Sequence, residues 1–143
     1  MKNILVAIDF SNLTEKVIAQ AQLLAEKFGA KIWLVHIAAP EPDFVGYDVG
    51  PQYIRDSRAN TLRTEHRDLQ QLAQLHAREG LEVEALMIQG PTAESILQES
   101  AKLEADLIVL GAEDHGKIFG KLFGSVWEDV LHRSKVPVLV VPG

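Results

Sequence analysis

Short apolar runs alternate with longer amphipathic segments along this chain. The unbroken run Ile4–Ile8, rich in β-branched residues, is typical of a strand covered on both faces, and Lys31–Ala38 is expected to be a second buried strand. Between them, apolar residues recur at spacings of three and four, which predicts an amphipathic helix that Gly29 ends. The residues on its apolar face are Leu13, Val17, Ala21, Leu24 and Phe28. A strand, a helix and a strand in this order predict a right-handed βαβ unit with parallel strands.

The start of this helix carries two competing N-cap signals. Asn12, with Glu15 three residues later, has the pattern of a capping box. Ser11 is an equally suitable N-cap residue. We therefore expect the helix to begin directly after one of these two side chains.

The same alternation continues to the end of the chain. Between Ala39 and Tyr53, prolines and glycines rule out a regular element, so an irregular loop is expected there. The elements expected after this loop are a helix from about Gln52 or Arg55 to Glu79, which Gly80 ends, a strand at Leu81–Ile88, a helix from Pro91-Thr92, a strand at Leu107–Leu110, a helix from Ser125 to about Arg133, and a strand at Val138–Val141.

Five strands alternating with four helices predict a doubly wound parallel α/β sheet, Rossmann-like, with helices on both faces. With the strands numbered along the chain, handedness and the usual winding favour the order 3-2-1-4-5. Ligands in such sheets bind beyond the carboxyl ends of the strands where the order reverses, here between strands one and four. The loops that meet at this point start at Asp9 and Gly111, so a ligand crevice is expected between them.

Composition narrows the class of protein. A chain of 143 residues with 47% hydrophobic content fits a single domain over residues 1–143. No apolar run is long enough to cross a bilayer, and the short run before Asp9 is no secretory signal, so we expect a cytoplasmic protein that does not bind membranes. The net charge of −6 argues against nucleic-acid binding. The absence of cysteine excludes disulfides, a cysteine-based zinc site and a thiol nucleophile.

The stretch from Asp106 to Gly143 carries the most informative chemical pattern. An apolar strand ends at Gly111, and a glycine-bearing loop then leads to the N-terminus of a helix at Gly124-Ser125. Backbone N–H groups of such a loop can approach an anion closely, and the helix dipole favours negative charge there. An anion-binding site is therefore expected where this helix begins.

Nearly the whole chain resembles the universal stress protein family, because five segments occur in the family's order and at its distances. They are Val6-Ala7-Ile8-Asp9-Phe10-Ser11, Leu34-Val35-His36-Ile37, Gly90-Pro91, Ala105-Asp106-Leu107-Ile108-Val109-Leu110-Gly111 and Pro137-Val138-Leu139-Val140-Val141. ATP-binding members carry Gly, two residues, Gly, nine residues and then Gly-Ser or Gly-Thr. Gly111 and Gly124-Ser125 occupy the outer positions of this pattern, whereas Asp114 stands at its middle glycine.

The resemblance implies a binding site for ATP or AMP, with the adenosine between the ends of strands one and two. The implied residues are Ala7, Ile8 and Asp9 against adenine and ribose, Ile37 over the base, Leu110-Gly111 beneath the ribose, and Gly124, Ser125 and Val126 as donors to the phosphates. Their chemistry is consistent with this ligand, because it combines an apolar slot, one carboxylate and a helix N-terminus.

Two residues depart from the implied site. Asp114 would place a carboxylate beside phosphate, where repulsion at about 4 Å and an effective dielectric constant near 20 amounts to roughly 4 kcal/mol. His115, Lys117 and Lys121 could offset this charge, or Mg²⁺ bound together with the nucleotide could bridge Asp114 to the phosphates. Trp127 replaces a small hydroxyl residue near the terminal phosphates, where its indole either blocks a γ-phosphate or packs against the loop.

Several residues also have purely structural interpretations. Asp9 could cap the turn after its strand, Asp106 is better explained as a turn residue than as a ligand, and His36 as a packed core histidine. The five histidines show no metal-ligand spacing, and no general base is fixed against the Ser125 hydroxyl. The chain thus carries no enzyme signature, and slow ATP hydrolysis is the most catalysis that it supports.

Two functions remain open at this point. One is a universal stress protein that acts as a nucleotide-binding regulatory module of the stress response. The alternative is a member that binds no nucleotide and acts only through protein–protein contacts.

The last strand, within Val136–Val141, is expected at an edge of the sheet. An apolar edge exposes unpaired backbone groups, and Pro137 and Pro142 confine pairing to the residues between them. Antiparallel pairing with the same strand of a second copy would give a two-fold homodimer, the arrangement of the resembled family. The alternative is a monomer whose edge is shielded by its own loop from Ala39 to Tyr53.

Overall fold

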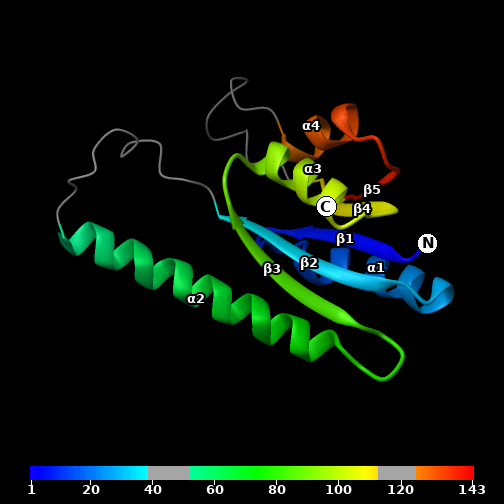
Figure 1. Ribbon diagram of the computed structural model, residues 1–143, viewed down its shortest axis with the longest axis horizontal. Helices are drawn as coiled ribbons and strands as arrows, with labels where there is room; N and C mark the ends of the chain where they lie inside the picture. The colour runs from blue at the N-terminus through cyan, green and yellow to red at the C-terminus, as the bar shows by residue number, and fades with distance from the viewer. Residues whose placement is uncertain (39–51, 113–124) are drawn as a thin grey trace.

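The computed structural model describes residues 1–38, 52–112 and 125–143. Strands and helices alternate along these residues, as expected (Figure 1). Their bounds are β1 Asn3–Ile8, α1 Thr14–Phe28, β2 Lys31–Ala38, α2 Gln52–His76, β3 Val83–Gln89, α3 Thr92–Lys102, β4 Leu107–Gly111, α4 Val126–Arg133 and β5 Val138–Val141. Within these ranges, no helix combines the length and the apolar character that are needed to cross a membrane.

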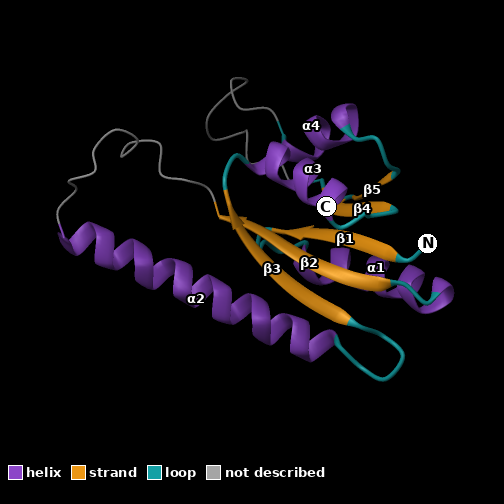
Figure 2. Cartoon of the chain, viewed as in Figure 1, coloured by secondary structure: helices purple, strands orange, loops and turns teal. Residues whose placement is uncertain are grey.

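All the strands pair in parallel, in the order β3-β2-β1-β4-β5, which confirms the predicted order and the doubly wound fold class. β1 is central and pairs with β2 over its full length and with β4 over Ile4–Val6. α1 and α2 pack on one face of the sheet, and α3 and α4 pack on the other (Figure 2). The strand order therefore reverses between β1 and β4.

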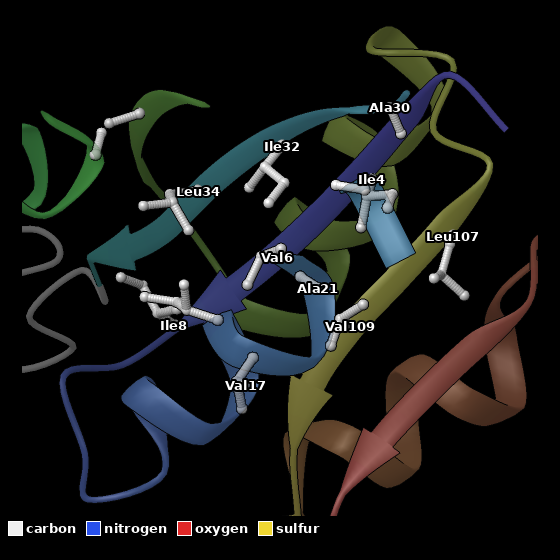
Figure 3. Close-up of a cluster of buried hydrophobic side chains, with 14 of the residues drawn as sticks. Ile4, Val6, Ile8, Val17, Ala21, Ala30, Ile32, Leu34, Leu107 and Val109 are labelled. Carbon is white, nitrogen blue, oxygen red and sulfur yellow. The ribbon is translucent and has the colours of Figure 1, made fainter. Parts of the chain in front are cut away.

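Each face of the sheet has its own hydrophobic core, because successive strand residues point to opposite faces. On one face, Ile4, Val6 and Ile8 of β1 belong to the core that α1 and α2 cover. Figure 3 shows them beside Val17 and Ala21 of α1. The buried residues of the second core, under α3 and α4, are Leu5, Val35, Ile37, Ile96, Ala105, Ile108, Leu110 and Val130. The central strand is thus covered on both faces, as its unbroken apolar run predicts.

The start of α1 differs from both expected N-caps. Thr14 is the first helical residue, and Leu13 holds the N-cap position without a side-chain hydrogen bond. The predicted capping box of Asn12 and Glu15 is therefore wrong. The Ser11 hydroxyl accepts the N–H of Leu13 at 3.2 Å, so it shapes the turn before the helix instead of capping the helix itself.

The end of α1 is partly as expected. Gly29 ends the helix in the left-handed conformation, at a φ of 66°. Phe28, predicted on the inner face, is 57% exposed. Ala25 is the buried residue near the end of the helix, because it lies four residues after Ala21 and therefore on the same face.

The connection between α2 and β3 also differs from the sequence pattern. α2 ends at His76 rather than at Glu79. Arg78 and Leu81 exchange backbone hydrogen bonds at 3.2 and 2.8 Å, with Gly80 between them at a φ of 82°. This tight turn uses the residues that the pattern assigns to the strand, so β3 starts later than Leu81.

Asp106 is a structural residue at the amino ends of the strands. Its carboxylate accepts the backbone N–H groups of Lys2 and Asn3 at 2.6 and 2.9 Å. These hydrogen bonds stabilise the charged form and lower the pKa of Asp106 below its usual value. Asp106 therefore joins β4 to β1 at the end of the sheet opposite the expected crevice.

The packing of α2 generates a matched pair of substitutions. Leu69→Ala removes a fully buried side chain, and we expect it to lower the free energy of unfolding by about 2–5 kcal/mol. Leu75→Ala, on the same helix but 74% exposed, should change it by less than about 0.5 kcal/mol. Urea denaturation checks both values, and equal effects of the two substitutions would contradict the orientation of α2.

Candidate functional site

A crevice of about 240 Å³ opens at the carboxyl ends of the central strands. Ala7, Ile8 and Asp9 line it from the end of β1, Ile37 from β2, and Leu110-Gly111 from β4. These are the strand ends on the two sides of the reversal in strand order. The crevice therefore lies where the doubly wound topology predicts a ligand.

Three helices begin at this crevice. Thr14 lines it from the first turn of α1, Thr92 from the first turn of α3, and Val126 and Trp127 from the first turn of α4. The first N–H groups of a helix have no partner within the helix, and the helix dipole makes this end positive. The crevice thus presents the positive ends of helices. It also presents one negative charge, because Asp9 is the ionisable residue among the described residues that line it. This combination suits a ligand that carries both an anionic and a hydrogen-bond-donating group.

The structure brings most of the predicted site residues together. Nine of them lie in the described ranges, and those that line the crevice are Ala7, Ile8, Asp9, Ile37, Leu110, Gly111, Val126 and Trp127. Ser125 does not line it but directly precedes two residues that do. Asp114, His115 and Gly124 lie outside the described residues.

Ser125 is the N-cap residue of α4, yet its hydroxyl caps nothing. The residue is buried, and its Oγ has no hydrogen-bond partner among the described residues. A buried hydroxyl without a partner costs free energy, so such groups in folded proteins call for an explanation. A bound anion at the start of α4 would supply the missing acceptor.

Thr14 and Thr92 are lining residues that sequence reasoning missed. The Oγ1 atom of Thr14 is buried and, within the described ranges, has no hydrogen-bond partner. Both residues lie in the first turn of their helix, so the rule that ligands meet helix N-termini contained the signal. The mistaken start of α1 hid it for Thr14.

The turn after β1 gives Asp9 a structural role as well as a place in the crevice. Its Oδ1 accepts the backbone N–H of Ser11 at 3.0 Å, as the turn-capping interpretation predicts. Phe10, between them, has a φ of 60°, a left-handed conformation that is uncommon for a bulky residue. The two roles of Asp9 are compatible, because a carboxylate has acceptor capacity for several hydrogen bonds.

Gly111 is explained by packing as well as by any ligand. A Cβ atom at this position would lie 3.0 Å from Cδ1 and 3.2 Å from Cβ of Leu13, and 3.4 Å from Cγ2 of Val17. The absent side chain lets the start of α1 approach the end of β4. The glycine thus permits close packing beside the crevice.

Comparison with known proteins gives a consistent result. The family model described as "Universal stress protein family" matches residues 1–142. The "Universal stress protein in QAH/OAS sulfhydrylase 3'region" of Thermus aquaticus is 34% identical over 142 residues, which are 98% of each chain.

Solved structures share the fold. One is a universal stress protein in complex with cAMP, with a TM-score of 0.70, 22% identity, and coverage of 98% of this chain and 96% of that one. Another is the universal stress protein from Archaeoglobus fulgidus in complex with dAMP, with a TM-score of 0.66, 22% identity, and coverage of 99% and 98%.

The contact between Gly111 and Leu13 generates a double-mutant prediction. Gly111→Ala should lower the free energy of unfolding by about 1–3 kcal/mol, because the added methyl group overpacks the start of α1. With Leu13→Ala already present, the same change should cost less, because the closest contact, with Cδ1 of Leu13, is gone and the shorter side chain leaves room to adjust. Thermal unfolding of the four proteins in this cycle measures the coupling, and simple additivity would contradict the close approach.

Proposed function

This chain belongs to the universal stress protein family, and we propose that it binds an adenine nucleotide, AMP or ATP, as a regulatory module of the stress response. The observation that carries the proposal is the make-up of the crevice, where apolar strand ends, one carboxylate and three helix N-termini meet. An adenine nucleotide offers a matching flat apolar base, a sugar with hydroxyl donors, and an anionic phosphate.

Each part of the nucleotide has a complementary part of the crevice. Ile37 and Leu110, both buried, supply apolar contacts for the base. The Asp9 carboxylate accepts hydrogen bonds from hydroxyl or amine groups of the nucleoside. The N-terminus of α4, at Ser125 and Val126, favours the phosphate and supplies an acceptor for the Ser125 hydroxyl.

The ligands of the two solved relatives support this choice. Those proteins are complexes with cAMP and dAMP, and each ligand combines adenine, a pentose and one phosphate. Trp127 lines the crevice and also packs into the second core, so its indole occupies space at the phosphate end. We therefore expect AMP to bind at least as tightly as ATP, with Mg²⁺ entering only together with ATP.

The rival function, a module that acts only through protein contacts, leaves the buried hydroxyls of Thr14 and Ser125 without a purpose. Nucleotide binding gives both a hydrogen-bond partner. Catalysis is not part of the proposal, because no side chain in the described ranges is hydrogen-bonded to Ser125 Oγ to activate it as a nucleophile.

The sharpest substitution in this crevice is Asp9→Asn. It removes the negative charge while the amide oxygen can still accept the Ser11 N–H, so the turn should persist. We expect the Kd for AMP in calorimetry to rise about tenfold to a hundredfold, because a charge-assisted hydrogen bond is lost. Ser125→Ala should also raise the Kd for AMP, without unfolding the protein.

The matched control is Asp68→Asn, a carboxylate that lines a different groove, between α1 and α2. It should leave the Kd unchanged. Mass spectrometry of the denatured, freshly purified protein gives a first answer, since a tightly bound nucleotide co-purifies. Unchanged AMP binding in Asp9→Asn would show that this crevice is not the site.

We further propose that β5 pairs with β5 of a second copy to form a two-fold homodimer. β5 is an edge strand, and the carbonyls of Pro137 and Val141 accept hydrogen bonds from Ile108 of β4 and from Ala112, which follows β4, at 3.0 and 2.8 Å. Backbone groups alternate in direction along a strand, so Val138 and Val140 direct theirs to the open edge. Antiparallel pairing would satisfy these groups in both copies.

The alternating direction of the backbone groups along β5 identifies the residue whose substitution tests this dimer. Val140→Pro removes an outward N–H and should halve the mass measured by light scattering, with the circular dichroism spectrum retained. Val140→Thr keeps the N–H and the β-branched shape and should stay dimeric. A wild-type protein that is monomeric at high micromolar concentration would contradict the dimer.

A further inference from the structure

One buried ring, that of His36, contacts three separate parts of the fold. His36 lies in β2 opposite Ile8 of β1. Its Nδ1 is 3.0 Å from the carbonyl oxygen of Ile8, and its Nε2 is 3.3 Å from Oε2 of Glu65 on α2. The ring also packs against Phe10, with a distance of 4.8 Å between the ring centroids. His36 therefore joins α2 to the end of β1 and to the turn that follows it.

The partners of the two ring nitrogens determine how many protons the contact holds. A carbonyl oxygen only accepts, so Nδ1 of His36 carries a hydrogen that it donates to Ile8. In a neutral ring, Nε2 would then present a lone pair to Glu65. A hydrogen bond at this second contact needs one more proton, shared between imidazole and carboxylate. Loss of that proton leaves two acceptors facing each other.

The contact bears directly on the crevice. Ile8 and Asp9 line it, and Phe10, the next residue, has the unusual φ of 60°. A left-handed conformation of a bulky residue persists only where neighbouring groups stabilise it. The ring of His36 is one such group, because it packs against the ring of Phe10. On the other side, the turn is held by the hydrogen bond between Asp9 and Ser11.

We propose that His36 and Glu65 form a proton-dependent clasp that positions the Asp9 side of the crevice, so that ligand affinity falls when the pair loses its shared proton. The clasp acts on the binding site of the proposed function and rests on that function. His36 is a positioning residue here: it does not line the crevice, and it acts through Ile8 and Phe10.

Carboxylates from two helices and from the end of β1 lie around this contact. α2 contributes Glu65 and, beside Phe10, Asp68, and α1 contributes Glu15 to the same groove. Asp9 follows β1, and β3 places the uncharged Met87 opposite His36. The charged side chains that line this groove in the described ranges are thus carboxylates.

The test compares wild type with Glu65→Gln in calorimetric titrations with cAMP, whose phosphodiester does not titrate near neutral pH. From about pH 6 to about pH 8.5, wild-type affinity should fall about threefold to tenfold, the value of one hydrogen bond. Glu65→Gln should bind equally at both ends, because its amide donates to the lone pair of the neutral ring. His66→Gln, an exposed neighbour on α2, should retain the wild-type slope.

A second measurement keeps the clasp testable without a nucleotide. Nitrogen NMR of His36 should show hydrogens on both ring nitrogens at the lower pH and on Nδ1 alone at the higher pH. Amide protection of Phe10 and Ser11, compared at equal pH, should then be greater in Glu65→Gln than in wild type at the higher pH.

If cAMP does not bind, these NMR results still judge the clasp, while calorimetry with AMP judges the proposed function separately. Wild-type affinity that stays constant while the ring deprotonates would overturn the proposal, as would a ring that never carries the second proton.

Discussion

The reversal of strand order between β1 and β4 is the constraint on which the rest of the structure depends. β1 pairs with β2 on one side and with β4 on the other. The helix that follows β1 covers one face of the sheet, and the helix that follows β4 covers the opposite face. The connections after β1 and β4 therefore run to opposite faces and leave a crevice between them at the carboxyl ends of the strands. The crevice is a consequence of this topology before any ligand is considered.

Packing around the reversal sets what the crevice can hold. The missing side chain of Gly111 lets Leu13 approach β4. The buried side chains of Ile37 and Leu110 give the strand ends an apolar surface. The starts of α1, α3 and α4 add positive helix ends, and Asp9 adds one negative charge. The same few strand ends thus supply both the core of the domain and the chemistry of its candidate site.

The sequence predicts the fold well because periodicity and handedness are strong, local constraints. The alternation of apolar runs predicts the strands and helices, and handedness with the usual winding predicts the strand order. The glycine pattern and the topology then lead to Asp9 and Gly111 by separate arguments. The start of α1 was mispredicted because Asn12 matches a capping box, whereas Ser11 and Asp9 shape a turn there instead. The contact between His36 and Glu65 joins residues distant in sequence, so no local pattern contains it.

The central claim is that this crevice, and no other surface, binds the nucleotide. An NMR titration of the wild-type protein with AMP, followed through its backbone amides, tests it most directly. The account predicts the largest shifts at Ala7, Ile37 and Val126, which line the crevice. The largest shifts at Lys2, Arg78 and Gly80, in the groove near the amino ends of the strands, would contradict it.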